Sequence, residues 1–177
     1  MKILQIIGGV VVGGTETFVI SLVQGLIERG HDATLAITTT GSPIGEAAAS
    51  AGIPFAHLDG GPPKMSWQWF RETRRFLRNN RFDIVHSYGL RVSLGIRLMQ
   101  RRVRIDYHLT GVRGLDVLRS RTQAWFDRRT EHRLDAIVCN SQAVADRRMS
   151  LVGTPAARIR VIPNGIDTAR FNPHAPR

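Results

Sequence analysis

The chain has 177 residues, enough for one domain with a full hydrophobic core. Its one cysteine, Cys139, excludes an internal disulfide bond and fits a reducing cytoplasm, and one thiol with six scattered histidines argues against a structural zinc site. The net charge of +11 favours an anionic partner such as a membrane surface, a nucleic acid or a phosphorylated ligand, although a surface of solvated arginines would give the same charge. No apolar run approaches the roughly 20 residues that a membrane-spanning helix needs.

Short apolar runs, typical of buried strands, alternate along the chain with segments of helical spacing. In chain order the predicted elements are strand 3–7, a helix between Gly14 and Gly30, strand 33–39, helix 44–51, strand 53–58, helix 67–79, strand 82–86, helix 92–100, strand 103–109, helix 118–133, strand 136–140, a helix N-capped by Ser141, and strand 159–162.

This alternation predicts an α/β fold with a Rossmann-like, doubly wound, mostly parallel sheet and helices on both faces. We assign residues 1–170 to this single domain. The Pro-rich, polar tail 171–177 resembles the start of an interdomain linker. Ligands of such sheets bind outside the carboxyl ends of the strands. Segments 8–16, 86–90, 110–115 and 140–141 are therefore expected along one rim.

The first rim segment is rich in glycine. Its spacing imitates a phosphate-binding P-loop, but Gly14 stands where that motif needs its lysine, so we reject a nucleoside triphosphatase. No register gives G-x-G-x-x-G, so a standard NAD site is rejected too. Two interpretations remain open. Backbone N–H groups at Gly13, Gly14 and Thr15 bind an anion at the start of a helix, or the glycines only form a tight turn.

Four segments carry a specific pattern: Gly13-Gly14-Thr15-Glu16, the run FDIVHSYG at 82–89, the run DAIVCNSQA at 135–143, and RIRVIPNGID at 158–167 followed by Phe171 and Pro173. Together they resemble the N-terminal, acceptor-side domain of GT-B glycosyltransferases of family 4 (glycosyltransferase group 1). The last segment is the most specific. All four occur in the family's order, and together they cover the whole chain.

The resemblance implies one half of a retaining glycosyltransferase. Such an enzyme transfers a hexose from a nucleotide-sugar to a glycan or lipid-linked acceptor, as in cell-envelope polysaccharide biosynthesis. A C-terminal domain that these 177 residues lack would grip the donor with a Glu-x7-Glu pair, and the isolated domain is expected to be inactive. No cofactor or metal is expected. The alternative is a stand-alone Rossmann-like module that binds a sugar or nucleotide without catalysis. A reading frame that continues into the Glu-x7-Glu motif would favour the enzyme.

Two residues are implied to be catalytic, His86 and Tyr88. The family shows histidine at both positions of its H-x-H pattern, and here the second is Tyr88. A tyrosine can hydrogen-bond an acceptor hydroxyl, but a pKa near ~10 makes it a poor base near neutrality. If the acceptor attacks from the front face and the departing phosphate takes its proton, no protein base is required. His86 also has a structural interpretation, as a packed and hydrogen-bonded residue.

The substrate-binding residues are implied in the same way: Gly13, Gly14, Thr15, Glu16, Arg113, Asn140, Ser141 and Asn164. Three of them have structural alternatives. Glu16 is also an acidic residue in a first helical turn, where the helix dipole favours it. Arg113 suits a phosphate or sugar, but it is also one surface arginine among many. Asn164 belongs to an N-G turn at the expected hinge.

A basic segment follows the aromatic run at 67–70, with Arg71, Arg74, Arg75, Arg78 and Arg81 on one predicted helix. Aromatic residues beside arginines on an amphipathic helix suit an anionic membrane surface, so we expect a cytoplasmic protein attached peripherally to the inner membrane face. Alternatively, Trp69, Phe70 and Phe76 pack on the sheet and the arginines are solvated. A specific nucleic-acid partner is not expected, because no recognition motif is present.

Overall fold

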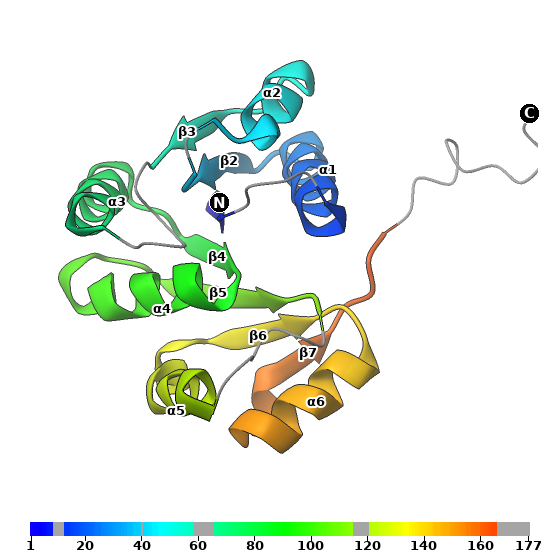
Figure 1. Cartoon of the computed structure of the whole chain (residues 1–177). Helices are drawn as coiled ribbons and strands as arrows, with labels where there is room; N and C mark the ends of the chain where they lie inside the picture. The colour runs from blue at the N-terminus through cyan, green and yellow to red at the C-terminus, as the bar shows by residue number, and fades with distance from the viewer. Residues whose placement is uncertain (9–12, 40, 59–65, 115–120, 166–177) are drawn as a thin grey trace, which may run out of the picture.

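A computed structural model describes residues 1–8, 13–39, 41–58, 66–114 and 121–165. Seven strands form one sheet in the order β3-β2-β1-β4-β5-β6-β7 (Figure 1). The strands are β1 Lys2–Ile7, β2 Asp32–Ile37, β3 Phe55–His57, β4 Ile84–Tyr88, β5 Tyr107–Val112, β6 Ala136–Cys139 and β7 Ile159–Val161. The helices are α1 Gly14–Glu28, α2 Pro43–Ser50, α3 Trp67–Asn80, α4 Leu90–Met99, α5 Arg121–Thr130 and α6 Gln142–Val152, with short 3-10 helices η1 Gln100–Arg102, η2 Glu131–Arg133 and η3 Ala156–Arg158.

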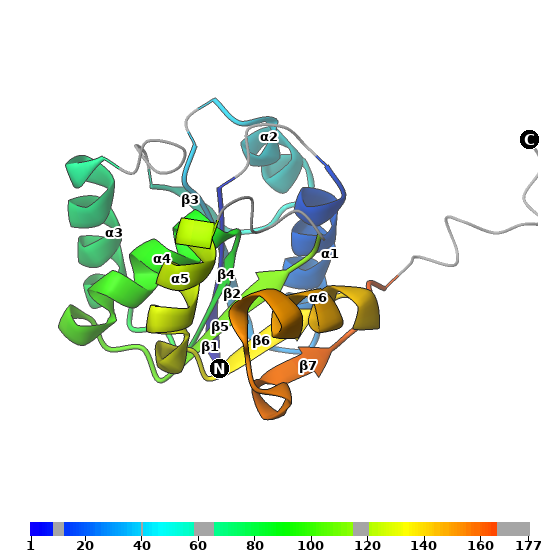
Figure 2. The same ribbon diagram turned by 60° about the horizontal axis from the view of Figure 1, so that its bottom comes forward.

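Each pair of neighbouring strands in this sheet is parallel. The chain winds from β1 to β3 in one direction and then from β4 to β7 in the other, so the strand order reverses between β1 and β4. Helices α1 and α2 lie on one side of the sheet and α3 and α4 on the other (Figures 1 and 2). The predicted Rossmann-like, doubly wound fold is confirmed. A crevice is expected where the order reverses.

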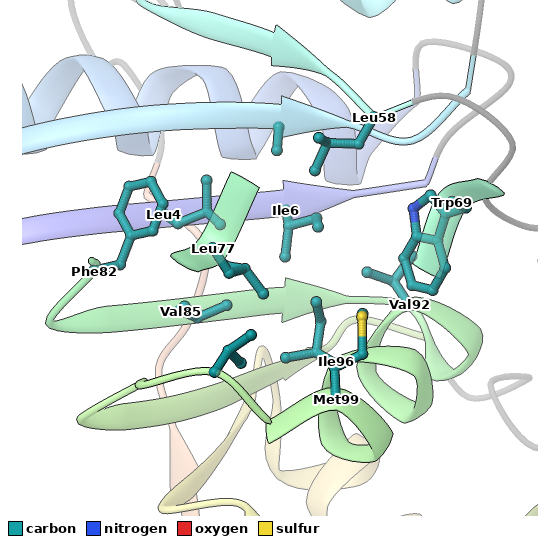
Figure 3. Packing of buried hydrophobic residues seen from close by; sticks show 12 residues of the cluster. Leu4, Ile6, Leu58, Trp69, Leu77, Phe82, Val85, Val92, Ile96 and Met99 are labelled. Carbon is teal, nitrogen blue, oxygen red and sulfur yellow. The ribbon is translucent and has the colours of Figure 1, made fainter. Parts of the chain in front are cut away.

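The core lies on both sides of the central strands. On the α3 and α4 side, residues from β1 and β4 meet residues from the two helices, as Figure 3 shows. Trp69 is fully buried there, next to Val92 of α4. On the α1 and α2 side, Val19 and Val23 of α1 pack against β1 and β2. Continuous apolar strands are what a sheet covered on both faces requires.

Serine side chains fix where three helices begin. Ser141 Oγ accepts a hydrogen bond from the Val144 N–H at 3.3 Å, which confirms the predicted N-cap of α6. Ser42 and Ser66 cap α2 and α3 in the same way. Among the described residues, no helix has the length and hydrophobicity that a membrane span requires.

Most strand boundaries differ from the sequence prediction by one to four residues, and two of the starts show why. Strand β4 begins at Ile84 rather than Phe82, and Phe82 packs into the core just before the strand. Strand β5 begins at Tyr107 rather than Val103, because Val103 and Ile105 also face the core from the segment after η1. Burial outside a strand therefore imitated the strand pattern. Strand β4 also ends two residues later than predicted, at Tyr88 rather than His86.

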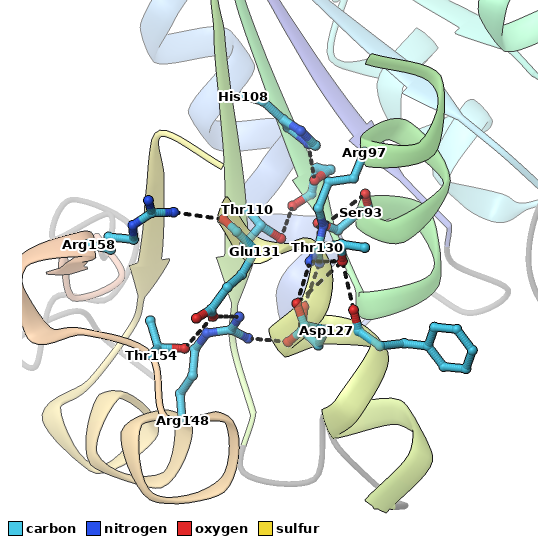
Figure 4. A network of polar contacts seen from close by, with 12 residues as sticks. Ser93, Arg97, His108, Thr110, Asp127, Thr130, Glu131, Arg148, Thr154 and Arg158 are labelled. Carbon is cyan, nitrogen blue, oxygen red and sulfur yellow. Dashed lines mark hydrogen bonds and ion pairs between the residues drawn. The ribbon is translucent and has the colours of Figure 1, made fainter. Parts of the chain in front are cut away.

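A buried polar network joins α4, α5 and α6 (Figure 4). The Asp127 carboxylate lies 2.7 Å from Arg97 Nη2 and 2.8 Å from Arg148 Nη1, and all three side chains are almost fully buried. Arg148 also pairs with Glu131, which accepts a hydrogen bond from Thr154 Oγ1 at 2.7 Å. Buried charges need such partners. This network links the three helices over the β5 to β7 half of the sheet.

Candidate functional site

A pocket of about 270 Å³ opens at the carboxyl ends of the strands, where the strand order reverses. It takes residues from three of the predicted rim segments. The lining residues are Ile7, Gly8, Thr15, Glu16, Tyr88, Gly89, Gly111, Arg113 and Gly114.

Tyr88 forms one wall of this pocket while its hydroxyl group is buried. The hydroxyl donates a hydrogen bond to Gln5 Oε1 at 2.8 Å and lies 3.0 Å from His86 Nδ1. Gln5 and His86 are paired across β1 and β4, and Tyr88 follows two residues later on the same face, so the phenol reaches both. The ring therefore faces the pocket, and the hydroxyl group belongs to the sheet.

Burial decides the protonation of this group. Desolvation, with the nearby Arg113 charge as a second cause, lowers the pKa of His86 to about 3, so the imidazole is neutral near pH 7. Because the phenol proton goes to Gln5, the neutral imidazole donates from Nδ1 to the phenol oxygen. Desolvation raises the pKa of Tyr88 well above its usual value near 10. Neither side chain is a proton acceptor of useful strength at neutral pH.

Gly111 makes room for the Tyr88 ring. The two residues are paired across β4 and β5. A Cβ atom at Gly111 would lie 2.6 Å from two ring carbons of Tyr88 and 3.2 Å from His86 Nε2. Any side chain there would displace the ring, so this position sets the width of the pocket floor. His86 Nε2 is buried without a hydrogen-bond partner among the described residues.

Arg113 covers one side of the pocket and is about half-buried. Its guanidinium carbon lies 3.4 Å from the centre of the Phe18 ring and 5.5 Å from that of Tyr88. Its Nη1 donates a hydrogen bond to Asn164 Oδ1, and its carbonyl oxygen accepts one from Asn140 Nδ2 at 3.4 Å. Stacking and hydrogen bonding hold the charge of Arg113 at the rim, where an anionic or hydroxylated ligand can reach it.

The start of α1 contributes a carboxylate. Glu16 Oε2 accepts a hydrogen bond from the Gly13 N–H at 3.0 Å, and Gly13 is the N-cap of α1. This contact satisfies one free N–H group of the helix start. It matches the structural interpretation of Glu16, although Glu16 and Thr15 also line the pocket.

The structure brings together only part of the predicted set. Thr15, Glu16, Tyr88 and Arg113 line the pocket, and Asn140 and Asn164 contact Arg113 from outside it. The remaining residues do not line it: His86 is buried behind Tyr88, Gly13 and Gly14 form the start of α1, and Ser141 caps α6. Ile166, Asp167, Phe171 and Pro173 of the fourth segment lie outside the described residues, as do residues 9–12 and Leu115.

Comparison with known sequence families shows to which family the chain belongs. The sequence profile of Glycosyltransferase Family 4 matches residues 12–170, which is most of the chain. The chain belongs to this family. No curated protein sequence matches it.

Solved structures similar to this family 4 domain include Anabaena HepE in complex with UDP, at a TM-score of 0.80 and 16% identity over 97% of this chain and 46% of that one. The lipopolysaccharide outer core galactosyltransferase WaaB has a TM-score of 0.73 and 16% identity, over 94% and 46%. A UDP-GlcNAc 2-epimerase from Methanocaldococcus jannaschii has a TM-score of 0.66 and 18% identity, over 93% of this chain and 46% of that one. The family 4 domain spans about half of each, and it corresponds to the N-terminal half of the GT-B fold.

Three residues of this family 4 domain that hold or limit Tyr88 and Arg113 were not predicted as site residues: Gln5, Phe18 and Gly111. The lining residues Ile7, Gly8, Gly89 and Gly114 were not predicted individually either, although all but Ile7 lie in predicted rim segments. Gln5 carried a signal, because a polar residue inside an apolar strand needs a buried partner. Phe18 had only the helical spacing of a core residue. The role of Gly111 depends on its pairing with Tyr88, which no local pattern in the sequence reveals.

Proposed function

We propose that this domain is the acceptor-binding half of a retaining glycosyltransferase, which moves a sugar from a nucleotide-sugar to a glycan or lipid-linked acceptor. The pocket at the strand-order reversal carries the proposal. It offers an aromatic wall at Tyr88, a held cation at Arg113 and a carboxylate at Glu16. Sugars are bound by apolar ring faces together with a few placed polar groups, and the arginine suits a phosphate or hydroxyl oxygen.

The protonation of the pocket supports transfer with retention of configuration. Neutral His86 and protonated Tyr88 cannot take the acceptor proton at pH 7. In a front-face attack the departing phosphate oxygen takes that proton while the new glycosidic bond forms, so no protein base is needed. We expect the transfer to need no metal cofactor. Nuclear magnetic resonance of the first product formed would reveal the anomeric configuration, and an inverted product would contradict this step.

The donor belongs to a second domain in this proposal. The chain covers 46% of the HepE structure, which contains UDP. A donor-binding domain facing the pocket across a cleft would bring the nucleotide-sugar to Arg113 and Glu16. WaaB, a lipopolysaccharide outer core galactosyltransferase with the same fold, supports a role in cell-envelope glycan synthesis.

Titration calorimetry with UDP- and GDP-sugars tests whether the donor binds to a second domain. One sample is the 177-residue chain and the other, the joined form, is the same chain extended by the residues that its reading frame encodes next, which in this proposal form the donor-binding domain. The proposal expects heat of binding only in the joined form. Equal binding by the short chain would overturn it and favour a self-contained sugar- or nucleotide-binding module.

Arg113 and a matched arginine give a second test. In the joined form, Arg113→Gln should lower kcat/KM at least tenfold, because the rim charge is lost. Arg147→Gln removes the same charge from an exposed position of α6 and should leave kcat/KM unchanged. Equal rates for the two variants would exclude Arg113 from the site.

A further inference from the structure

A second hollow lies away from the strand-end pocket, between α3 and the end of α4 with η1. Its volume is about 460 Å³. Figure 1 shows α3 and α4 side by side on the same face of the sheet. The residues that line this groove are Trp67, Phe70, Arg71, Arg74, Leu98, Met99, Arg101, Arg102 and Arg133.

The charge of this groove has one sign. Five of its lining residues are arginines, and no aspartate or glutamate lines it. Within the described residues, no carboxylate lies within ion-pair distance of Arg71, Arg74, Arg101 or Arg102. Arg133 is held in place, because its Nη1 donates to the Arg97 carbonyl oxygen at 2.8 Å. Several guanidinium groups at one hollow repel one another unless an anion neutralises them.

Large apolar side chains stand at the mouth of the same groove. Trp67 is 79% exposed and Leu98 is 57% exposed, whereas Phe70 and Met99 continue inward to the core cluster. The indole group and the leucine side chain are exposed to water among arginines. Their transfer from water into an apolar phase would be favourable. The arginine stems can lie along the same surface while their charged ends remain in water.

We propose that this groove docks on the headgroups of an anionic phospholipid bilayer, with Trp67 and Leu98 entering the interface. The arginines match the lipid phosphates, and the two exposed apolar side chains match the region beneath the headgroups. A nucleic acid would meet the same charge, but it offers no apolar layer for Leu98. The occupant favoured by the whole groove is therefore the membrane surface.

The proposal extends beyond sugar transfer and differs from the sequence expectation in its residues. Trp69 is fully buried and takes no part. Arg75, Arg78 and Arg81 do not line the groove, whereas Leu98, Arg101 and Arg102 of α4 and η1 do. The docking surface thus comes from three separate parts of the sequence: residues 67–74, residues 98–102 and Arg133 of η2.

Vesicle co-sedimentation tests the charge. Phosphatidylcholine vesicles with and without 30 mole per cent phosphatidylglycerol are compared at low salt. The double variant Arg71→Ala/Arg101→Ala should bind the anionic vesicles roughly 30-fold more weakly, because each arginine near such a surface contributes about a fivefold factor. The control Arg29→Ala/Arg147→Ala removes the same charge from exposed positions outside the groove and should bind like the original chain.

Tryptophan fluorescence tests the insertion. The chain has three tryptophans, and Trp69 is buried, so in a Trp125→Phe background Trp67 is the exposed one. Its emission should shift to shorter wavelength on anionic vesicles and be quenched by lipids brominated near the headgroup. The variant Leu98→Ser should weaken binding without changing the charge.

Three outcomes would overturn the proposal. The first is an absence of binding to anionic vesicles at low salt. The second is equal loss of binding in the groove variant and in its charge-matched control, which would indicate attraction by net charge alone. The third is binding of the groove to single- or double-stranded DNA with no quenching of Trp67 by brominated lipid, which would assign the arginines to a nucleic acid. These readouts do not depend on glycosyl transfer, so they can fail while the proposed activity stands.

Discussion

The ring and the hydroxyl group of Tyr88 have different roles. Its ring forms a wall of the pocket, and its hydroxyl group is bonded to Gln5 and lies beside His86 inside the sheet. The family's second histidine would place a titratable ring at this position. Here the phenol has a pKa well above its usual range, so the substitution removes proton transfer and retains a flat apolar surface. This favours binding over acid-base chemistry as the role of Tyr88.

Tyr88→Phe distinguishes these roles. The change leaves Gln5 Oε1 buried without its donor and should lower the free energy of unfolding by about 1–2 kcal/mol. In the joined enzyme, kcat/KM should fall by less than about tenfold, because the ring remains. Urea denaturation and initial rates measure the two effects. Tyr107→Phe alters an exposed tyrosine and serves as the control. A loss of 100-fold or more would show that the hydroxyl takes part in the reaction.

Strands β4 and β5 meet at one contact that limits the pocket. Gly111→Ala would place a methyl group 2.6 Å from the Tyr88 ring, so the ring or the strand must move. We expect a loss of about 1–3 kcal/mol in the free energy of unfolding, as for other overpacked sites. Gly114→Ala is the control, since its methyl group would meet nothing within 4 Å. Thermal unfolding of both variants measures the difference in stability, and equal stability would contradict the close contact between Gly111 and the Tyr88 ring.

Helices α4, α5 and α6 depend on the buried carboxylate of Asp127. Asp127→Ala would leave Arg97 and Arg148 buried without their shared partner, at a cost of about 3–5 kcal/mol. Asp106→Ala breaks an exposed pair with Arg104 and should change stability by no more than about 0.5 kcal/mol. Chemical denaturation of the two variants measures the contrast. A small loss for Asp127→Ala would show that water reaches the network.

The elements were predictable to different degrees. The alternation of apolar runs and helical segments predicted each strand and α-helix of the described residues, but not the short 3-10 helices. Ser141 was recognised as a cap because serine before a helix satisfies a free N–H group. The starts of β4 and β5 were misplaced, because Phe82 and Val103 are buried without being in a strand. Local patterns report burial, and they do not say which element provides it.

At the scale of the whole molecule, sheet order creates the site. Residues from β1, β4 and β5 become neighbours only because the order reverses between β1 and β4. The position of the rim could be predicted from the sequence, because ligands of parallel sheets bind at the carboxyl ends of the strands. The contacts of Tyr88 with Gln5 and Gly111 could not be predicted, because they depend on the register of three strands that are far apart in sequence. The sequence therefore predicted the location of the pocket and named Tyr88, but it did not predict the contacts that hold the Tyr88 ring in place.

The stability of the whole molecule should fall in mild acid because two histidines are buried in the neutral form. Burial lowers the pKa of His86 and of His108 to about 3 in the folded protein, against about 6.5 in the unfolded chain. Between these values the unfolded chain binds protons that the folded protein does not, so the free energy of unfolding decreases as the pH falls below about 6.5.

At pH 5 the expected loss is about 2 kcal/mol for each of these histidines, relative to pH 7. Urea denaturation at the two pH values measures it. The double variant His86→Gln/His108→Gln can be less stable at pH 7, yet the difference between pH 7 and pH 5 should shrink by about 4 kcal/mol. His132→Gln, which replaces an exposed histidine, serves as the control. If the double variant kept the full pH dependence, other groups would cause the acid sensitivity, and the +11 chain would owe it to general charge repulsion.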